Sequence, residues 1–205
     1  MVFDFGGVLV DWSPHYLYRK LLNGDDAAID RFLSEVGFST WNVQQDKGRP
    51  FKEAVVVLSA EFPHYAHLIN AYDERYAESI RGPIQGTVNI LRLLKAAGYP
   101  LYGLSNWSTE KFNLVRSDYE FFSWFDDILI SGAVRLVKPD PAIFALFLRQ
   151  IKRTAADCVY IDDSLANIAA AEHLGFTTIH FISPTQLAVE LDRLGVLHLN
   201  GQALH

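Results

Sequence analysis

Six polar residues follow short apolar runs of this sequence. They are Asp4, Ser105, Asn106, Lys138, Asp162 and Asp163. Paired carboxylates without a neighbouring histidine or cysteine suit a hard cation with oxygen ligands, and Mg²⁺ is the usual one near phosphate. A lysine amine and a serine hydroxyl add donors for an anion. The set therefore predicts attack by a carboxylate on an electrophile held beside a metal ion.

Each of these residues alone has an ordinary structural interpretation. Asp4 could cap a turn, Ser105 could cap a helix, and Lys138 before a proline could be a solvated loop residue. Together, however, these residues follow successive predicted strands. The carboxyl ends of parallel strands form the ligand-binding edge of an open sheet, so this placement favours a chemical role over the separate structural ones.

Short apolar runs and helical patterns alternate along most of the chain. We expect strands at 100–104, 128–130, 158–161 and 177–181, and helices at 87–97, from 108, at 141–151 and at 165–174. This alternation predicts an α/β fold with a doubly wound, Rossmann-like parallel sheet. Only three residues precede Asp4, so we expect a first strand that is short for its kind, with a natural start upstream of Met1.

The stretch 13–80 has helical periodicity throughout and interrupts this alternation. Turn-spaced leucine, isoleucine and valine residues predict a bundle of three or four helices. We therefore expect an α/β core formed by residues 1–12 and 81–205, with residues 13–80 as a small inserted helical cap. The hinges are expected near Asp11–Pro14 and Arg81–Pro83, where the chain passes between the two parts.

Composition narrows the class of protein. The 205 residues are 50% hydrophobic and 20% charged, with a formal net charge of −6, which predicts a folded globule and excludes a disordered chain. The acidic balance argues against a nucleic-acid partner. No apolar run is long enough to span a membrane, and a signal peptide is not evident, so we expect a cytoplasmic protein that is a monomer or a homodimer.

Four short segments, in order, resemble the motifs of the haloacid dehalogenase superfamily of hydrolases. They are VFDFGGVLVD at 2–11, LSN at 104–106, VKPDP at 137–141 and YIDDSLANI at 160–168. The resemblance implies that Asp4 is a nucleophile that forms a covalent aspartyl intermediate. It implies that Ser105 and the Asn106 N–H hold the phosphoryl group, and that Lys138 neutralises the negative charge of the nucleophile and of the phosphoryl oxygens. Mg²⁺ would be held by Asp4, the Gly6 carbonyl, Asp162 and Asp163.

Gly6 departs from the pattern of this family's phosphatases, which usually carry a second aspartate there as general acid and base. Such an acid is typically worth about 10²–10⁴ in rate. Three explanations stay open. The substrate could have a leaving group that needs little protonation, Asp11 or a cap residue such as His15 could supply the proton, or the reaction could be dehalogenation.

The double aspartate at 162–163 favours a phosphatase, because dehalogenases of the family need no acid pair there. Gly6 together with this pair resembles the sugar-phosphate phosphatases of the glucose 1-phosphate type. We therefore expect a Mg²⁺-dependent phosphomonoesterase for a small phosphorylated metabolite. The alternatives are a metal-independent 2-haloacid dehalogenase and a non-catalytic or weakly active binding protein with this fold.

The stretch 41–50 of the expected cap is the candidate for reading the substrate. We expect it to be a loop between two helices, in which side chains can bind a polar or anionic substrate and an aromatic face can contact a sugar ring. The candidate residues are Trp41, Gln45, Lys47 and Arg49.

Overall fold

The computed structural model describes residues 1–197 and contains a five-stranded parallel sheet with the strand order β5-β4-β1-β6-β7. The strands are β1 (Val2–Phe3), β4 (Tyr102–Ser105), β5 (Asp127–Ile130), β6 (Val159–Asp162) and β7 (Thr177–His180). All four neighbouring pairs run parallel, so each connection crosses over through helical segments. The predicted α/β fold with a doubly wound sheet is confirmed, and the strands lie within two residues of the expected positions.

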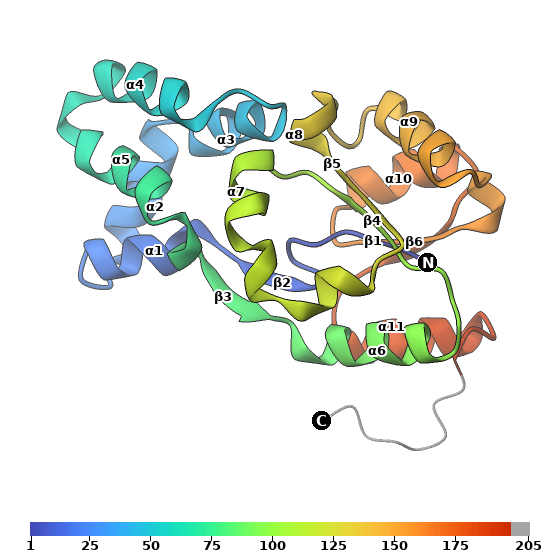
Figure 1. Cartoon of the computed structure of the whole chain (residues 1–205). Helices are drawn as coiled ribbons and strands as arrows, with labels where there is room; N and C mark the ends of the chain where they lie inside the picture. Colours follow the sequence, from blue (N-terminus) through green and yellow to red (C-terminus); the bar gives the residue numbers. More distant parts are fainter. Residues whose placement is uncertain (198–205) are drawn as a thin grey trace.

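Helices cover both faces of this sheet (Figure 1). α6 (Gln85–Ala96) and α11 (Pro184–Arg193) pack side by side on one face, and α9 (Pro141–Ile151) and α10 (Leu165–His173) lie on the other. The side chains of Val2 and Phe3 belong to two different apolar clusters because successive residues of a strand point to opposite faces. The central strand therefore contributes to both halves of the core.

Five α-helices lie between β2 (Val10–Trp12) and β3 (Ile80–Pro83), where three or four were expected, and we call residues 14–79 the helical insert. They are α1 (Pro14–Leu21), α2 (Asp26–Glu35), α3 (Phe38–Asp46), α4 (Phe51–Glu61) and α5 (Ala66–Glu74). Only Val36 and Gly37 separate α2 from α3. Gly37 has φ +59°, a left-handed conformation that ends one helix and turns the chain into the next.

β2 and β3 pair antiparallel at the base of the helical insert. Val10 lies opposite Pro83 and Asp11 opposite Gly82, with a register shift between Asp11 and Trp12. The ladder occupies the positions where hinges were expected. The division into core and cap remains a prediction, and residues 198–205 of the expected core range lie outside the described residues.

Short helices complete the connections. They are α7 (Thr109–Val115), α8 (Ser131–Val134) and the 3-10 turns η1 (Pro63–Tyr65), η2 (Tyr76–Ser79), η3 (Arg116–Asp118), η4 (Glu120–Trp124) and η5 (Ala155–Asp157). α7 ties the insert to the sheet, since the buried Lys111 donates from Nζ to the Asp73 carbonyl at 2.8 Å and pairs with the Asp73 carboxylate. Among the helices of residues 1–197, none is long and apolar enough to cross a bilayer.

Candidate active site

Strand order brings the predicted site residues together. β1 lies at the centre of the sheet, and Asp4 follows it directly, with its N–H donating to the Ile161 carbonyl at 2.9 Å. Ser105 ends the neighbouring β4, and Asp162 ends β6 on the other side. Three polar residues from segments far apart in the sequence therefore meet at the carboxyl edge of the sheet.

Lys138 lies in the loop between α8 and α9 and is fully buried among these side chains. Its Nζ is 3.0 Å from Asp4 Oδ2, 2.7 Å from Asp162 Oδ2 and 2.9 Å from the Leu104 carbonyl oxygen. The Asn106 side chain holds the backbone of Lys138 at two points: its Nδ2 donates to the Lys138 carbonyl at 2.9 Å, and its Oδ1 accepts from the Lys138 N–H at 2.8 Å. The ammonium is therefore fixed between two carboxylates.

Asp162 is fully buried, and donors surround its carboxylate. Besides Lys138, it accepts from the Ser164 N–H at 2.8 Å, from Asn167 Nδ2 at 3.0 and 3.1 Å, and from the Tyr160 hydroxyl. Burial alone would raise the pKa of Asp162, but the Lys138 charge and these hydrogen bonds hold that pKa below its ordinary value. Asp162 is thus a fixed anion that orients Lys138.

Asp4 has a different electrostatic environment. Burial raises the pKa of its carboxyl group to about 7, and the Lys138 charge and hydrogen bonds from Ser105 and Lys138 act against that rise. Burial also acts to lower the pKa of Lys138, but the charges of Asp4 and Asp162 raise it above its ordinary value. The lysine therefore stays cationic beside Asp4.

Three carboxylates could hold a cation at this edge. One oxygen from each of Asp4, Asp162 and Asp163 lies within 4.8 Å of the others. Asp163 is exposed, whereas the other two are buried, so an ion would approach from the Asp163 side. The carboxylate of Asp163 also lies against Gly7, where an added Cβ would be 2.3 Å from Asp163 Oδ2. This all-oxygen donor set fits Mg²⁺.

We expect a Gly7→Ala substitution to weaken Mg²⁺ binding about tenfold or more, because the new methyl group would displace the Asp163 carboxylate. The measurement is the Mg²⁺ dissociation constant from calorimetric titration. Gly24→Ala is the matched control, since Gly24 has φ +78°, similar to +73° at Gly7, but a Cβ there meets nothing within 4 Å. An equal loss of affinity in both variants would contradict the role of the Asp163 contact.

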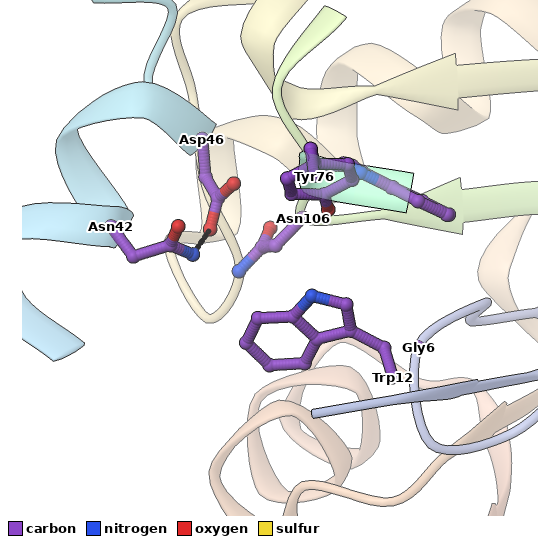
Figure 2. A pocket seen from close by; sticks show the side chains of 7 residues that line it. Gly6, Trp12, Asn42, Asp46, Tyr76 and Asn106 are labelled. Carbon is purple, nitrogen blue, oxygen red and sulfur yellow. Dashed lines mark hydrogen bonds between the residues drawn. The ribbon is translucent and has the colours of Figure 1, made fainter. Parts of the chain in front are cut away.

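A small cavity of about 80 Å³ lies between this edge of the sheet and the helical insert (Figure 2). Its lining combines aromatic rings with amide and carboxylate groups, and consists of Gly6, Trp12, Asn42, Asp46, Tyr76, Asn106 and Trp107. The indole N–H groups of Trp12 and Trp107 lie beside the hydroxyls of Tyr72 and Tyr76 but make no hydrogen bond of normal geometry in the described residues. The lining therefore combines apolar rings with polar side chains.

The four residues of the insert that were expected to bind substrate do not line this cavity. Trp41 and Gln45 are buried, and their side chains donate to the carbonyls of Ala54 and Trp41 at 3.3 and 2.7 Å. Arg49 donates to Gln45 Oε1 at 2.8 Å, and Lys47 is exposed. The structure brings Asn106 and the carboxylates of Asp4 and Asp162 together around Lys138. The four side chains expected to bind substrate lie elsewhere in the insert.

Asn42 and Asp46 are the residues of the same stretch that reach the cavity, and the sequence interpretation missed them. The stretch was expected to be a loop, but α3 extends to Asp46. Residues four apart lie on one face of a helix, so Asn42 and Asp46 point the same way. The polar sequence of 42–46 carries no clear helical periodicity, so the sequence held no strong signal that could have identified them.

A sequence model described as haloacid dehalogenase-like hydrolase matches residues 1–175. The chain is 25% identical to the sesquiterpene phosphatase astK of Aspergillus oryzae, over 94% of each chain. It is 21% identical to a phosphorylated carbohydrates phosphatase of Thermotoga maritima, over 88% of this chain and 83% of the other.

Among solved structures, the fold matches the HAD family enzyme BT-2542 of Bacteroides thetaiotaomicron, in its complex with magnesium and inorganic phosphate. The TM-score is 0.66 at 21% identity, and the match covers 89% of this chain and 93% of that one. At this identity the similarity supports the shared fold.

Proposed function

The chain belongs to the haloacid dehalogenase-like hydrolase family, and on that premise we propose that it is a Mg²⁺-dependent phosphomonoesterase that acts through an aspartyl-phosphate intermediate. Its phosphatase relatives make it a phosphatase-type hydrolase. The proposal adds the metal, the nucleophile and the substrate class. The observation that carries it is the contact of Asp4 with Lys138, 3.0 Å apart, beside the exposed Asp163 carboxylate.

The chain's own residues account for most of the chemistry. Asp4 attacks phosphorus with a carboxylate oxygen, while Ser105 and the Asn106 N–H hold the phosphoryl oxygens and Lys138 offsets their charge. Positioning and charge stabilisation of this kind are most of what phosphoryl transfer requires. When bound, Mg²⁺ would supply further positive charge for the phosphoryl oxygens. Water then hydrolyses the aspartyl phosphate and regenerates Asp4.

We assign the metal to Asp4, the Gly6 carbonyl and Asp163. Asp162 was expected to be a ligand as well, but its carboxylate is fully buried and already accepts hydrogen bonds from four residues. We therefore assign it the task of holding Lys138. A glycine at position 6 is compatible with the metal site because the backbone carbonyl is the ligand.

The cavity supports a leaving group with substantial apolar surface. Trp12, Tyr76 and Trp107 line it, and the part of a terpenoid alcohol nearest the phosphate would contact these rings, since a cavity of about 80 Å³ takes only a part of such a chain. The relative named as a sesquiterpene phosphatase is consistent with this class. A sugar phosphate is the second candidate, since Asn42 and Asn106 offer amides for hydroxyl groups and another relative is named for phosphorylated carbohydrates.

A panel of phosphate esters distinguishes the two leaving-group classes. We expect farnesyl and related prenyl monophosphates to give higher kcat/KM than glucose 1-phosphate or fructose 6-phosphate. Trp12→Ala should reduce that preference, because the indole contributes apolar surface to the cavity. A higher kcat/KM for sugar phosphates, unaffected by Trp12→Ala, would support the second candidate instead.

Removal of the metal tests the reaction class. We expect phosphate release to fall to background after full chelation with EDTA and to return on addition of Mg²⁺, because the carboxylate set holds an ion needed by the reaction. The same preparation should release no chloride from 2-chloropropionate. Phosphatase activity that survives chelation would contradict the proposal, and metal-free chloride release would establish a dehalogenase.

A further inference from the structure

Gly6 leaves the site without the acid that protonates a leaving group, and the structure offers another carboxylate across the cavity. Asp46 is the last residue of α3, and its side chain lines the same cavity as Gly6. Figure 2 shows the Asp46 carboxylate and the Asn42 amide on one wall, with the Trp12 indole across from them. A leaving group that extends from the phosphoryl site into this cavity would meet Asp46.

Asp11 and His15, the two residues considered above as proton donors, form hydrogen bonds or ion pairs outside the cavity. The Asp11 carboxylate accepts from the Tyr16 hydroxyl at 2.7 Å in the β2–α1 region. His15 Nε2 lies 2.9 Å from Asp30 Oδ1 on the exposed side of the insert. Neither residue lines the cavity, whereas Asp46 does.

The backbone of Asp46 is fixed to the core. Ser131 Oγ donates to the Asp46 carbonyl at 2.6 Å, and the Ser131 side chain is fully buried. Two residues further on, Gly48 packs so closely against the Gly132 carbonyl that a Cβ would lie 2.7 Å from its oxygen. The end of α3 is therefore docked on α8, and the Asp46 side chain has a defined position.

Resting on the proposed phosphatase function, we propose that Asp46 is the general acid that protonates the leaving-group oxygen, in place of the acid absent at Gly6. Asp4 forms a bond to phosphorus, the bond between phosphorus and the leaving oxygen breaks, and its electron pair takes the Asp46 proton. The product is a neutral alcohol, and Asp46 is left as a carboxylate. Water attacks the aspartyl phosphate next, and its proton returns to Asp46.

The surroundings of Asp46 suit a group that must hold a proton near neutral pH. Burial raises the pKa of Asp46 to about 7, and a hydrogen bond from the Ser108 N–H acts against this rise. The side chain accepts from Asn42 Nδ2 at 3.3 Å and makes no ion pair within residues 1–197. The titratable groups that face it, Tyr72 and Tyr76, are buried and have raised pKa values, so both stay neutral.

Single-turnover experiments on Asp46→Asn, with Mg²⁺-loaded enzyme in excess, test the proposal. We expect release of the alcohol from an alkyl phosphate to slow by about 10²–10⁴. Release of 4-nitrophenolate from 4-nitrophenyl phosphate should stay near the wild-type rate, because this leaving group departs without a proton. Asp11→Asn is the matched control and should keep both rates, since its carboxylate lies outside the cavity.

The pH profile of the alkyl phosphate step provides a second readout. The acid acts in its protonated form, so the wild-type rate should fall on the alkaline side of about pH 7, and Asp46→Asn should lack this fall. The Asp4 nucleophile must be ionised in both proteins, so the acid side of the two profiles should be the same. Gly6→Asp has room for its side chain, as a Cβ there meets nothing within 4 Å. Added to Asp46→Asn, it should restore alkyl phosphate turnover.

The proposal would be overturned if Asp46→Asn slowed the reactions of both substrates equally and Gly6→Asp restored neither rate. Asp46 would then have a structural role. Unchanged alkyl phosphate turnover in Asp46→Asn would overturn it as well. These results differ from failure of the proposed function, in which the wild-type enzyme would release phosphate from neither ester.

Discussion

Asp4→Asn is expected to lower the rate of phosphate release by at least about 10³-fold, because the amide cannot form the covalent intermediate. The substitution keeps the side-chain volume, and Lys138 keeps its 2.7 Å contact with Asp162, so the fold should persist. Acid quenching during turnover should trap a phosphorylated wild-type protein but no phosphorylated variant. The measurements are steady-state turnover and mass spectrometry of the quenched protein.

Asp26→Asn is a suitable control for this variant. Asp26 is an exposed aspartate that pairs with Arg19 at 2.7 Å on the insert surface. Its replacement should leave both turnover and the trapped intermediate unchanged. Residual turnover above about 1% in a folded Asp4→Asn protein would assign the nucleophile to another residue.

Lys138→Met is expected to lower the free energy of unfolding by about 3–5 kcal/mol, because it leaves Asp4 and Asp162 as neighbouring buried carboxylates without their cation. Turnover should also fall, since the ammonium that offsets phosphoryl charge is gone. Urea unfolding with and without Mg²⁺ measures the first effect. Mg²⁺ should recover part of the stability by binding Asp4 and Asp163.

A double variant separates stability from catalysis. Lys138→Met with Asp162→Asn removes the cation and one of its buried anions, so much of the lost stability should return while turnover stays low. Lys95→Met is the control for loss of a lysine, since Lys95 and Asp126 form a half-exposed pair expected to contribute at most about 1 kcal/mol. Equal destabilisation by Lys95→Met and Lys138→Met would contradict the special role of the buried pair.

The sheet, and the polar residues at the carboxyl ends of its strands, were largely predictable from the sequence. Short apolar strands alternate with helices, and parallel strands end on one side, so Asp4, Ser105 and Asp162 had to converge once the strand order placed β1 between β4 and β6. The strand order itself came from the structure. Local pattern alone does not determine which strands are neighbours.

The cavity was not predictable in the same way. Trp12, Tyr76 and Trp107 come from β2, η2 and the loop after β4, and only tertiary packing brings their rings together. A hinge was expected near Arg81–Pro83 because the chain passes there between the two expected parts, and Gly82 and Pro83, which are unfavourable in strand interiors, gave no sign of the strand β3. An edge position opposite β2 tolerates both residues. The end of α3 was missed because its polar residues were interpreted as a loop.

The antiparallel ladder of β2 and β3 makes the insert a replaceable module. The Ile84 N–H donates to the Leu9 carbonyl at 2.8 Å, so the two ends of the segment that contains the helical insert lie within hydrogen-bond reach of each other. Because the cost of closing a loop rises only slowly with its length, inserts of very different size could join the same two points. The edge of the sheet that carries Asp4 would keep its geometry in each case, so evolution could exchange the residues that the insert contributes to the cavity, Asp46 as the proposed proton donor among them, independently of the proposed nucleophile.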